Sequence, residues 1–213
     1  MSARNQQRAR LAGSRAGRGS PHAPRPWVSG PVHVTLKLCR GLPSLRTPRA
    51  YRVLERAFRA GKEKEGFGLY QFSVQRDHIH LIVEVNNRME LSRGMQGLAI
   101  RIAKAINKHW GGRQGTVFAE RYFARALEKP MQVWRAIRYV VNNARKHGEW
   151  SSDTQPDPFS SGRWLHCWEH LPGIRWPTRS PPLARARHYL TISWRNFPLA
   201  LTDLPGTPSY GAY

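Results

Sequence analysis

Hydrophobic and polar residues alternate along three segments in the central part of the chain, which is the pattern of strands that bury one face. In residues 31–39, one side carries Val32, Val34, Leu36 and Leu38, and the other carries His33, Thr35 and Lys37. In residues 67–75, Tyr70, Phe72 and Val74 oppose Leu69, Gln71, Ser73 and Gln75. In residues 78–85, Ile79, Leu81, Val83 and Val85 oppose His78, His80, Ile82 and Glu84. The Arg-Asp pair between the last two segments predicts a tight turn.

Three further segments have the spacing of amphipathic helices. A Thr-Pro pair at residues 47–48 is a good helix start, and apolar residues then recur at helical spacing as far as Gly66. Residues 90–110 carry one apolar stripe. The far side of that helix carries Arg93, Arg101, Lys104 and Lys108. Residues 130–148 begin with Pro and end with Gly, which predicts a third helix over this range.

The order of these elements predicts the fold. Residues 116–128 have the pattern of a strand or bent hairpin, which completes the order β-α-β-β-α-β before the last helix. This order matches the ferredoxin-like split βαβ arrangement, an α+β fold whose antiparallel sheet carries helices on one face. The opposite face would be open and polar. It would collect His33, Thr35, Lys37, Gln71, Ser73, Gln75, His78, His80 and Glu84.

Composition divides the chain into three parts. Residues 1–28 are rich in Arg, Gly, Ser, Ala and Pro, which predicts a disordered basic arm, although a solvated extension without function explains the same composition. Residues 29–149 hold the periodic pattern and are expected to form one domain of ordinary size, the part of the chain in which we look for chemistry. Residues 150–213 form a Pro/Trp-rich extension that we expect to pack on the core, with stacking on single-stranded bases as the alternative. Its tryptophans are Trp150, Trp164, Trp168, Trp176 and Trp194.

The charge of the chain indicates its partner. The 213 residues include 35 Lys and Arg against 13 Asp and Glu, a formal net charge of +22. Such a chain repels itself unless a polyanion neutralises it, and nucleic acid is the expected polyanion. Two cysteines are too few for a secreted multi-disulfide fold, and no segment approaches the ~20 apolar residues of a membrane span. We therefore expect a cytoplasmic, nucleoid-associated protein with no membrane partner.

The sharpest local motif is the His-Ile-His sequence at residues 78–80. Side chains alternate across a strand, so His78 and His80 point the same way and two imidazoles can share one metal ion. Alternating histidines on an exposed strand face are common, and a purely structural role explains the motif better when it is taken alone. A third ligand and a reacting group are needed.

Both can come from the third helix. Its buried stripe would consist of Val133, Ile137, Val140, Val141 and Ala144. Tyr139 lies off this stripe, and Asn143 follows it one helical turn later. One flank would therefore present Gln132, Arg135, Tyr139, Asn143 and Lys146. A tyrosine at a helix border with its hydroxyl in water is the alternative interpretation.

Together, these motifs and the order of elements resemble the HUH single-tyrosine transposases, which include the REP-associated tyrosine transposases and related nickases. These proteins have a ferredoxin-like core, a His-hydrophobic-His motif on a central strand, and a catalytic Tyr followed four residues later by an Asn or Gln metal ligand. The resemblance covers about residues 31–148. It implies that Tyr139 is the nucleophile and that His78, His80 and Asn143 are metal ligands. It also implies attachment of the tyrosine to the 5′ side of the cleaved strand, with a free 3′ hydroxyl.

Two segments depart from the pattern of the family. The family sequence Asn-Pro-Val-Arg-Ala-Gly corresponds to Asn-Ala-Arg-Lys-His-Gly at residues 143–148. The family segment Gly-x-x-Trp-Gln-x-Arg-Tyr/Phe corresponds to residues 115–122, where Phe-Ala replaces Trp-Gln. These departures indicate a divergent branch. The prediction therefore includes both a mobile transposase and a domesticated, immobile enzyme.

The expected chemistry explains why these residue types occur together. A cation held by two neutral imidazoles and an amide keeps its charge where phosphate oxygens gain negative charge. A tyrosine nucleophile forms a phosphotyrosine that a later DNA hydroxyl can reverse without ATP. We expect Mg²⁺ or Mn²⁺, since histidine ligands favour Mn²⁺ by affinity whereas Mg²⁺ is abundant.

Other residues are weaker candidates. The predicted DNA contacts are Arg93, Arg101, Lys104, Lys108, Arg121, Arg135 and Lys146, with a solvated helix face as the alternative for those at residues 93–108. Tyr122 is a rival nucleophile, but it lies on the predicted strand and has no amide side chain one helical turn away. A zinc site from Cys39, His166, Cys167 and His170 fits no standard spacing, so packing explains these residues better.

The function predicted from the sequence is cleavage and rejoining of single-stranded or hairpin DNA by a monomer or homodimer. The alternative is a catalytically silent nucleic-acid-binding module, because many RNA-binding domains combine a ferredoxin-like sheet with basic helices. That module would display aromatic side chains on the open sheet face. The predicted open face carries His, Gln, Ser and Thr instead, which favours the enzyme.

Overall fold

The structure, a computed structural model, describes residues 29–152, 154–165 and 177–185. The predicted arm at residues 1–28, Trp168, Trp176, Trp194 and three of the four suggested zinc ligands lie outside these residues. The strands are β1 (Gly30–Lys37), β2 (Glu63–Lys64), β3 (Phe67–Val74), β4 (His78–Val85) and β5 (Phe123–Ala126). The helices are α2 (Pro48–Gly61), α3 (Arg88–His109), α4 (Pro130–Val141), α5 (Asn143–Lys146) and the 3₁₀ turn η1 (Ser161–Trp164).

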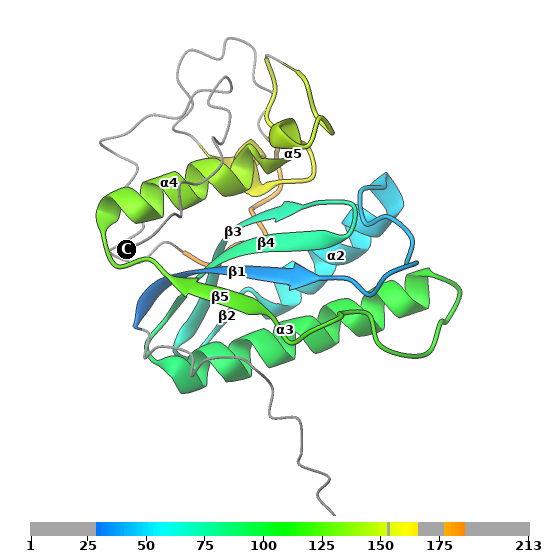
Figure 1. Ribbon diagram of the computed structural model, residues 1–213, viewed down its shortest axis with the longest axis horizontal. Helices are drawn as coiled ribbons and strands as arrows, with labels where there is room; N and C mark the ends of the chain where they lie inside the picture. The colour runs from blue at the N-terminus through cyan, green and yellow to red at the C-terminus, as the bar shows by residue number, and fades with distance from the viewer. Residues whose placement is uncertain (1–28, 153, 166–176, 186–213) are drawn as a thin grey trace, which may run out of the picture.

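The strands form one antiparallel sheet in the order β2-β3-β4-β1-β5. Helices α2 and α3 cover one face of the sheet, and α4 lies across the other (Figure 1). The predicted α+β, ferredoxin-like class is confirmed. The polar face is less open than expected, because α4 packs against β3 and β4 on that side.

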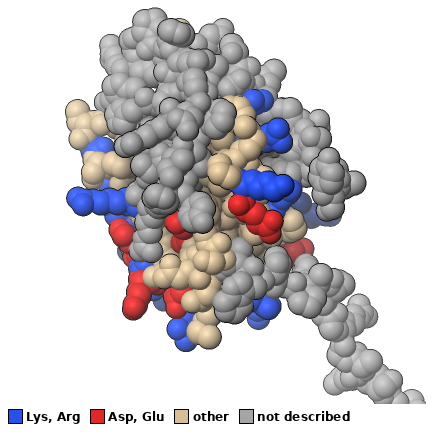
Figure 2. Space-filling model, turned by 90° about the vertical axis from the view of Figure 1, so that its left-hand side faces the viewer, with Lys and Arg blue, Asp and Glu red and all other residues tan. Residues whose placement is uncertain are grey.

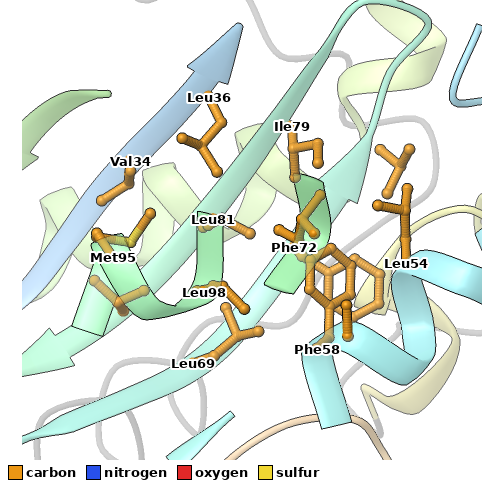
Figure 3. Close-up of a cluster of buried hydrophobic side chains, with 14 of the residues drawn as sticks. Val34, Leu36, Leu54, Phe58, Leu69, Phe72, Ile79, Leu81, Met95 and Leu98 are labelled. Carbon is orange, nitrogen blue, oxygen red and sulfur yellow. The ribbon is translucent and has the colours of Figure 1, made fainter. Parts of the chain in front are cut away.

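The main core lies between the sheet and the pair α2 and α3. Figure 3 shows side chains of β1, β3 and β4 meeting Leu54 and Phe58 of α2 and Met95 and Leu98 of α3. Helix α3 comes so close to the sheet that a Cβ on Gly94 would lie 2.1 Å from the ring of Phe67. Burial of this apolar surface holds the helices to one face, so chemistry is left to the other.

Both core helices begin at side-chain caps. The Oγ1 of Thr47 accepts a hydrogen bond from the Ala50 amide, with Pro48 in the first turn as the sequence predicts. The Oδ1 of Asn87 accepts a hydrogen bond from the Glu90 amide. Helix α3 therefore begins at Arg88, two residues before the predicted start. Helix α2 ends at Gly61 instead of Gly66, because the short strand β2 then pairs with β3.

A β-bulge in β3 makes the predicted alternation of this strand wrong at its start. The register shifts between Leu69 and Gln71, so Leu69 joins the core beneath the sheet and Tyr70 turns to the α4 side. The ring of Tyr70 lies over Gly68, where a Cβ would be 2.8 Å from it. Alternation resumes with Phe72 in the main core.

The predicted last helix is interrupted. Helix α4 ends at Val141, Asn142 has φ −102° and ψ 8°, and α5 begins at Asn143. Asparagine competes with the helical backbone for hydrogen bonds, which favours a break at this point. The predicted strand or hairpin at residues 116–128 is a strand only at β5, with one isolated bridge between Leu38 and Phe118 before it.

Residues 154–165 run along the edge of β3 that faces away from β4, where Ser160 forms an isolated bridge with Ser73 and where Phe159 and Trp164 pack against the main core. The Oγ of Ser161 accepts a hydrogen bond from the Phe72 amide and lies next to Oε1 of Gln71. Arg46 contacts both carboxylate oxygens of the buried Asp157, at 2.9 and 3.1 Å. The polar residues of β3 therefore hold a structural segment, and the part of the polar face that is left for chemistry lies on β1 and β4.

Candidate active site

His78 and His80 lie on β4 and point to the same sheet face, as the alternation predicts. Their Nε2 atoms are 3.1 Å apart. The Nδ1 of His78 lies 2.8 Å from Oδ1 of Asp77, and a carboxylate only accepts. Nδ1 of a neutral His78 therefore carries the proton, and its Nε2 presents a lone pair toward His80.

Two residues of β1 contact the other side of His80. Thr35 Oγ1 and His33 Nε2 each lie 3.2 Å from Nδ1 of His80. Thr35 lies directly opposite His80 in the antiparallel register, which is why its short side chain reaches the ring. When Nδ1 of His80 donates to either acceptor, its Nε2 presents a second lone pair toward His78.

Burial keeps the inner histidines neutral. Desolvation, followed by repulsion from Arg125, lowers the pKa of His33 to about 4. The pKa of His80 is lowered well below its ordinary value, first by burial and then by the positive charge that His33, His78, His147 and Lys146 can carry. A neutral imidazole keeps a lone pair for a metal ion, so both shifts favour metal binding at neutral pH.

Helix α4 places Tyr139 over this cluster. The centroid of its half-buried ring lies 5.3 Å from that of His80 and 5.7 Å from that of His33, both edge-on. Two basic side chains lie nearby, at the end of α5: Nζ of Lys146 lies 5.5 Å from the Tyr139 ring centroid, and the ring of His147 lies 5.9 Å from that of His78. The phenol of Tyr139, four imidazoles and the amine of Lys146 thus gather on one face of the sheet.

Asn143 is fully buried at the start of α5. Among the described residues, neither its Oδ1 nor its Nδ2 has a hydrogen-bond partner. A buried amide without partners carries a free-energy cost of about 1–3 kcal/mol, so its presence calls for an additional ligand. The sequence predicts that Asn143 follows Tyr139 by one turn of the same helix. The break at Asn142 makes this prediction wrong, because Asn143 begins α5.

These residues fit a divalent metal ion. When two nitrogens bind one metal ion at about 2.1 Å each, with a nitrogen–metal–nitrogen angle between about 90° and the tetrahedral value, they lie about 3.0–3.4 Å apart. The Nε2 atoms of His78 and His80 are 3.1 Å apart, which is within this range. In the described part of the chain, no three His, Cys, Asp or Glu side chains are arranged to hold a metal. Asn143, whose buried amide has no partner among the described residues, is a further candidate ligand.

The predicted DNA contacts fall on two sides of the sheet. Four of them lie on α3, namely Arg93, Arg101, Lys104 and Lys108. The apolar side of α3 packs on the sheet face opposite His80, so this basic helix does not adjoin the histidines. Arg135 is exposed one turn before Tyr139 on α4, Lys146 adjoins that ring, and Arg121 is exposed just before β5. In the view of Figure 2, the coloured Lys and Arg residues alternate with Asp and Glu. The contacts themselves remain predictions.

Two other candidates are displaced from the site. Gln132 was expected beside Tyr139, but its Oε1 accepts hydrogen bonds from the amides of Glu128 and Lys129 at the start of α4. The partly buried Tyr122 packs against the core on the α2 and α3 side of the sheet, away from His80. The capping box at the start of α4 holds Gln132, and burial against the main core holds Tyr122.

Sequence reasoning missed four residues near the histidines. His33 and Thr35 were assigned to the polar face without a role, and His147 was not considered; strand register and the turn after α4 bring them together. Phe123 was not assigned to that face, yet it lies opposite Thr35 in the β1–β5 register. The expectation that this face lacks aromatic side chains is therefore wrong, and it no longer separates the enzyme from the binding module.

Comparisons with known proteins agree with this architecture. The family model described as "Transposase IS200 like" matches residues 43–143, which include both histidines, Tyr139 and Asn143. A solved structure described as "Structure of the REP associates tyrosine transposase bound to a REP hairpin" has a TM-score of 0.56 to this chain, with 18% sequence identity. The similarity covers 79% of this chain and 100% of that one. None of the curated proteins matches the chain.

The family match over residues 43–143 and the shared fold confirm the predicted resemblance to the HUH single-tyrosine transposases. They support a DNA-processing transposase function of the endonuclease and strand-transferase kind. Proteins of this family generally use a divalent metal. Among the described residues, no helix combines the length and apolar character that crossing a membrane requires.

Proposed function

We propose that this protein cleaves and rejoins single-stranded or hairpin DNA through a covalent 5′-phosphotyrosine at Tyr139. The observation that carries the proposal is the position of the Tyr139 ring, 5.3 Å from that of His80 and beside the facing Nε2 atoms of His78 and His80. The solved structure of similar fold contains a REP hairpin, which supports hairpin DNA as the substrate class.

His78, His80 and Asn143 would hold Mg²⁺ or Mn²⁺ in this proposal. When bound, the ion supplies positive charge where the phosphate oxygens gain negative charge. Asp77 would hold the proton of His78 on Nδ1, and Thr35 or His33 would accept the Nδ1 proton of His80, so that both rings turn a lone pair toward the same point.

The chemical step conserves one phosphoester bond. The Oη of Tyr139 forms a bond to phosphorus while the bond from phosphorus to the 3′ oxygen breaks. The phenolic proton leaves to solvent, and the released 3′ oxygen takes up a proton and becomes a hydroxyl. Lys146, whose Nζ lies 5.5 Å from the Tyr139 ring centroid, places a positive charge next to the reacting phosphate. Attack by a 3′ hydroxyl on the phosphotyrosine reverses the step and rejoins the strand.

An adduct assay tests this function. The full-length protein is incubated with Mn²⁺ or Mg²⁺ and end-labelled hairpin DNA, denatured, and separated by electrophoresis. The native protein and Tyr122→Phe should form a denaturation-resistant protein–DNA adduct, whereas Tyr139→Phe should form none. An adduct that survives in Tyr139→Phe and disappears in Tyr122→Phe would contradict the assigned nucleophile. Absence of any adduct with the native protein would favour the silent binding module.

A further inference from the structure

Phe123 exposes an aromatic ring on the same sheet face as the histidine cluster. It is 69% exposed, more than any other large hydrophobic side chain in the described part of the chain. The antiparallel register places Phe123 opposite Thr35, and Thr35 opposite His80, so the three form one row across β5, β1 and β4. Residues that pair directly across neighbouring strands lie on the same face of the sheet. Phe123 and His80 are two strands apart, so about 10 Å separates them across the sheet.

The neighbouring residues of β5 explain why Phe123 does not pack inward. Ala124 and Ala126 contact the main core on the α2 and α3 side, while Leu127 joins the cluster under α4. Helix α4 packs against β3 and β4, away from the edge formed by β5. Within the described residues, the ring of Phe123 therefore borders the site on the side that α4 leaves uncovered.

Cationic side chains flank this ring. Lys37 is exposed and lies opposite His78, which places it one pleat beyond Thr35 on the same face. Arg125 lies opposite His33 and is close enough to lower its pKa. An aromatic face between two positive charges suits a base whose phosphates lie on either side. It suits a second copy of a chain with a net charge of +22 poorly.

We propose that Phe123 is a stacking platform for one base of the single-stranded DNA that enters or leaves the site, with Lys37 and Arg125 beside the flanking phosphates. This inference rests on the proposed function, because it places the strand between Tyr139 and the β5 edge. The stacking tolerates any base, since every base has a π-face, so the platform positions the strand without reading its sequence.

Binding to oligothymidylate tests the platform independently of cleavage. The full-length protein is titrated into fluorescein-labelled oligothymidylate with EDTA present, and anisotropy gives Kd. Phe123→Ala should weaken binding about tenfold, whereas Phe123→Trp should keep the native Kd because it retains an aromatic face. Ile100→Ala is the matched control, since Ile100 is a 48% exposed hydrophobic residue on α3, on the other side of the sheet.

The outcomes separate this inference from the proposed function. Unchanged affinity in Phe123→Ala, or equal losses in Phe123→Ala and Ile100→Ala, would overturn the platform even if the native protein forms the adduct. A concentration-dependent change in oligomeric state in Phe123→Ala without a change in Kd would overturn it in favour of an interface between copies. If the native protein forms no adduct but Phe123→Ala alone loses affinity, the platform stands and the cleavage chemistry fails.

Discussion

Thr35 Oγ1 lies 3.2 Å from Nδ1 of His80, the ring nitrogen that faces away from His78. A hydroxyl here can accept the Nδ1 proton and leave the Nε2 lone pair for a metal ion. Thr35→Val keeps the shape and removes this acceptor, so we expect Mn²⁺ to bind about 10–100-fold more weakly by calorimetry. Thr35→Ser should retain nearly native affinity. Equal losses in both variants would indicate packing and not orientation.

The two strand histidines should bind the metal as a pair. Their Nε2 atoms are 3.1 Å apart, so removing either one leaves the other without its partner. We expect His78→Ala and His80→Ala each to abolish measurable Mn²⁺ binding in calorimetry and to abolish adduct formation. His109→Ala, at the end of α3, is the control and should bind Mn²⁺ normally. Full Mn²⁺ binding by His80→Ala would refute the predicted ligand set.

The stability of the metal-free protein should fall with acid partly through His33. Its pKa is about 4 in the folded chain, against an ordinary value of 6.5, because burial and Arg125 oppose protonation. Between these pH values the unfolded chain binds a proton that the folded chain does not, so stability present above pH 6.5 is lost toward pH 4. At about pH 4.5 this loss is about 2–3 kcal/mol.

Urea unfolding in EDTA at neutral pH and at about pH 4.5 measures this contribution. The free energy of unfolding should fall less between the two pH values in His33→Gln than in the native protein, by the contribution of His33 given above. The buried His80 adds a loss of the same sign in both proteins. Identical pH dependence in the two proteins would show that His33 is not the group that resists protonation.

Arg46 should be important for stability. Its side chain is 7% exposed, and its guanidinium contacts both carboxylate oxygens of Asp157 and donates to the Val74 carbonyl at 2.9 Å. Arg46→Met leaves the Asp157 carboxylate buried without its cation, so the free energy of unfolding in urea should fall by about 3–5 kcal/mol. Arg76→Met is the control, since the Arg76 side chain is 75% exposed, and should change it by less than about 0.5 kcal/mol.

The sequence predicts most of the fold because the strands and helices have clear periodicity. The alternation in residues 78–85 places His78 and His80 on one face, as observed. The bulge at Tyr70 and the break at Asn142 interrupt that periodicity, and the hydrophobic pattern does not signal either of them. The same limit applies to the site, since the register between β1 and β4 that brings Thr35 to His80 involves residues 45 positions apart in the chain.

The central claim is that Tyr139 forms the covalent bond to DNA, and peptide mapping of the adduct tests it most directly. Trypsin cleaves after Arg138 and Arg145 and so releases residues 139–145, a peptide whose only tyrosine is Tyr139. Tyr122 lies in a different tryptic peptide, residues 122–125. After nuclease and trypsin digestion of the purified adduct, mass spectrometry should find the added nucleotide on the first peptide, with the phosphate on Tyr139. A nucleotide on residues 122–125, or on any other peptide, would contradict the account.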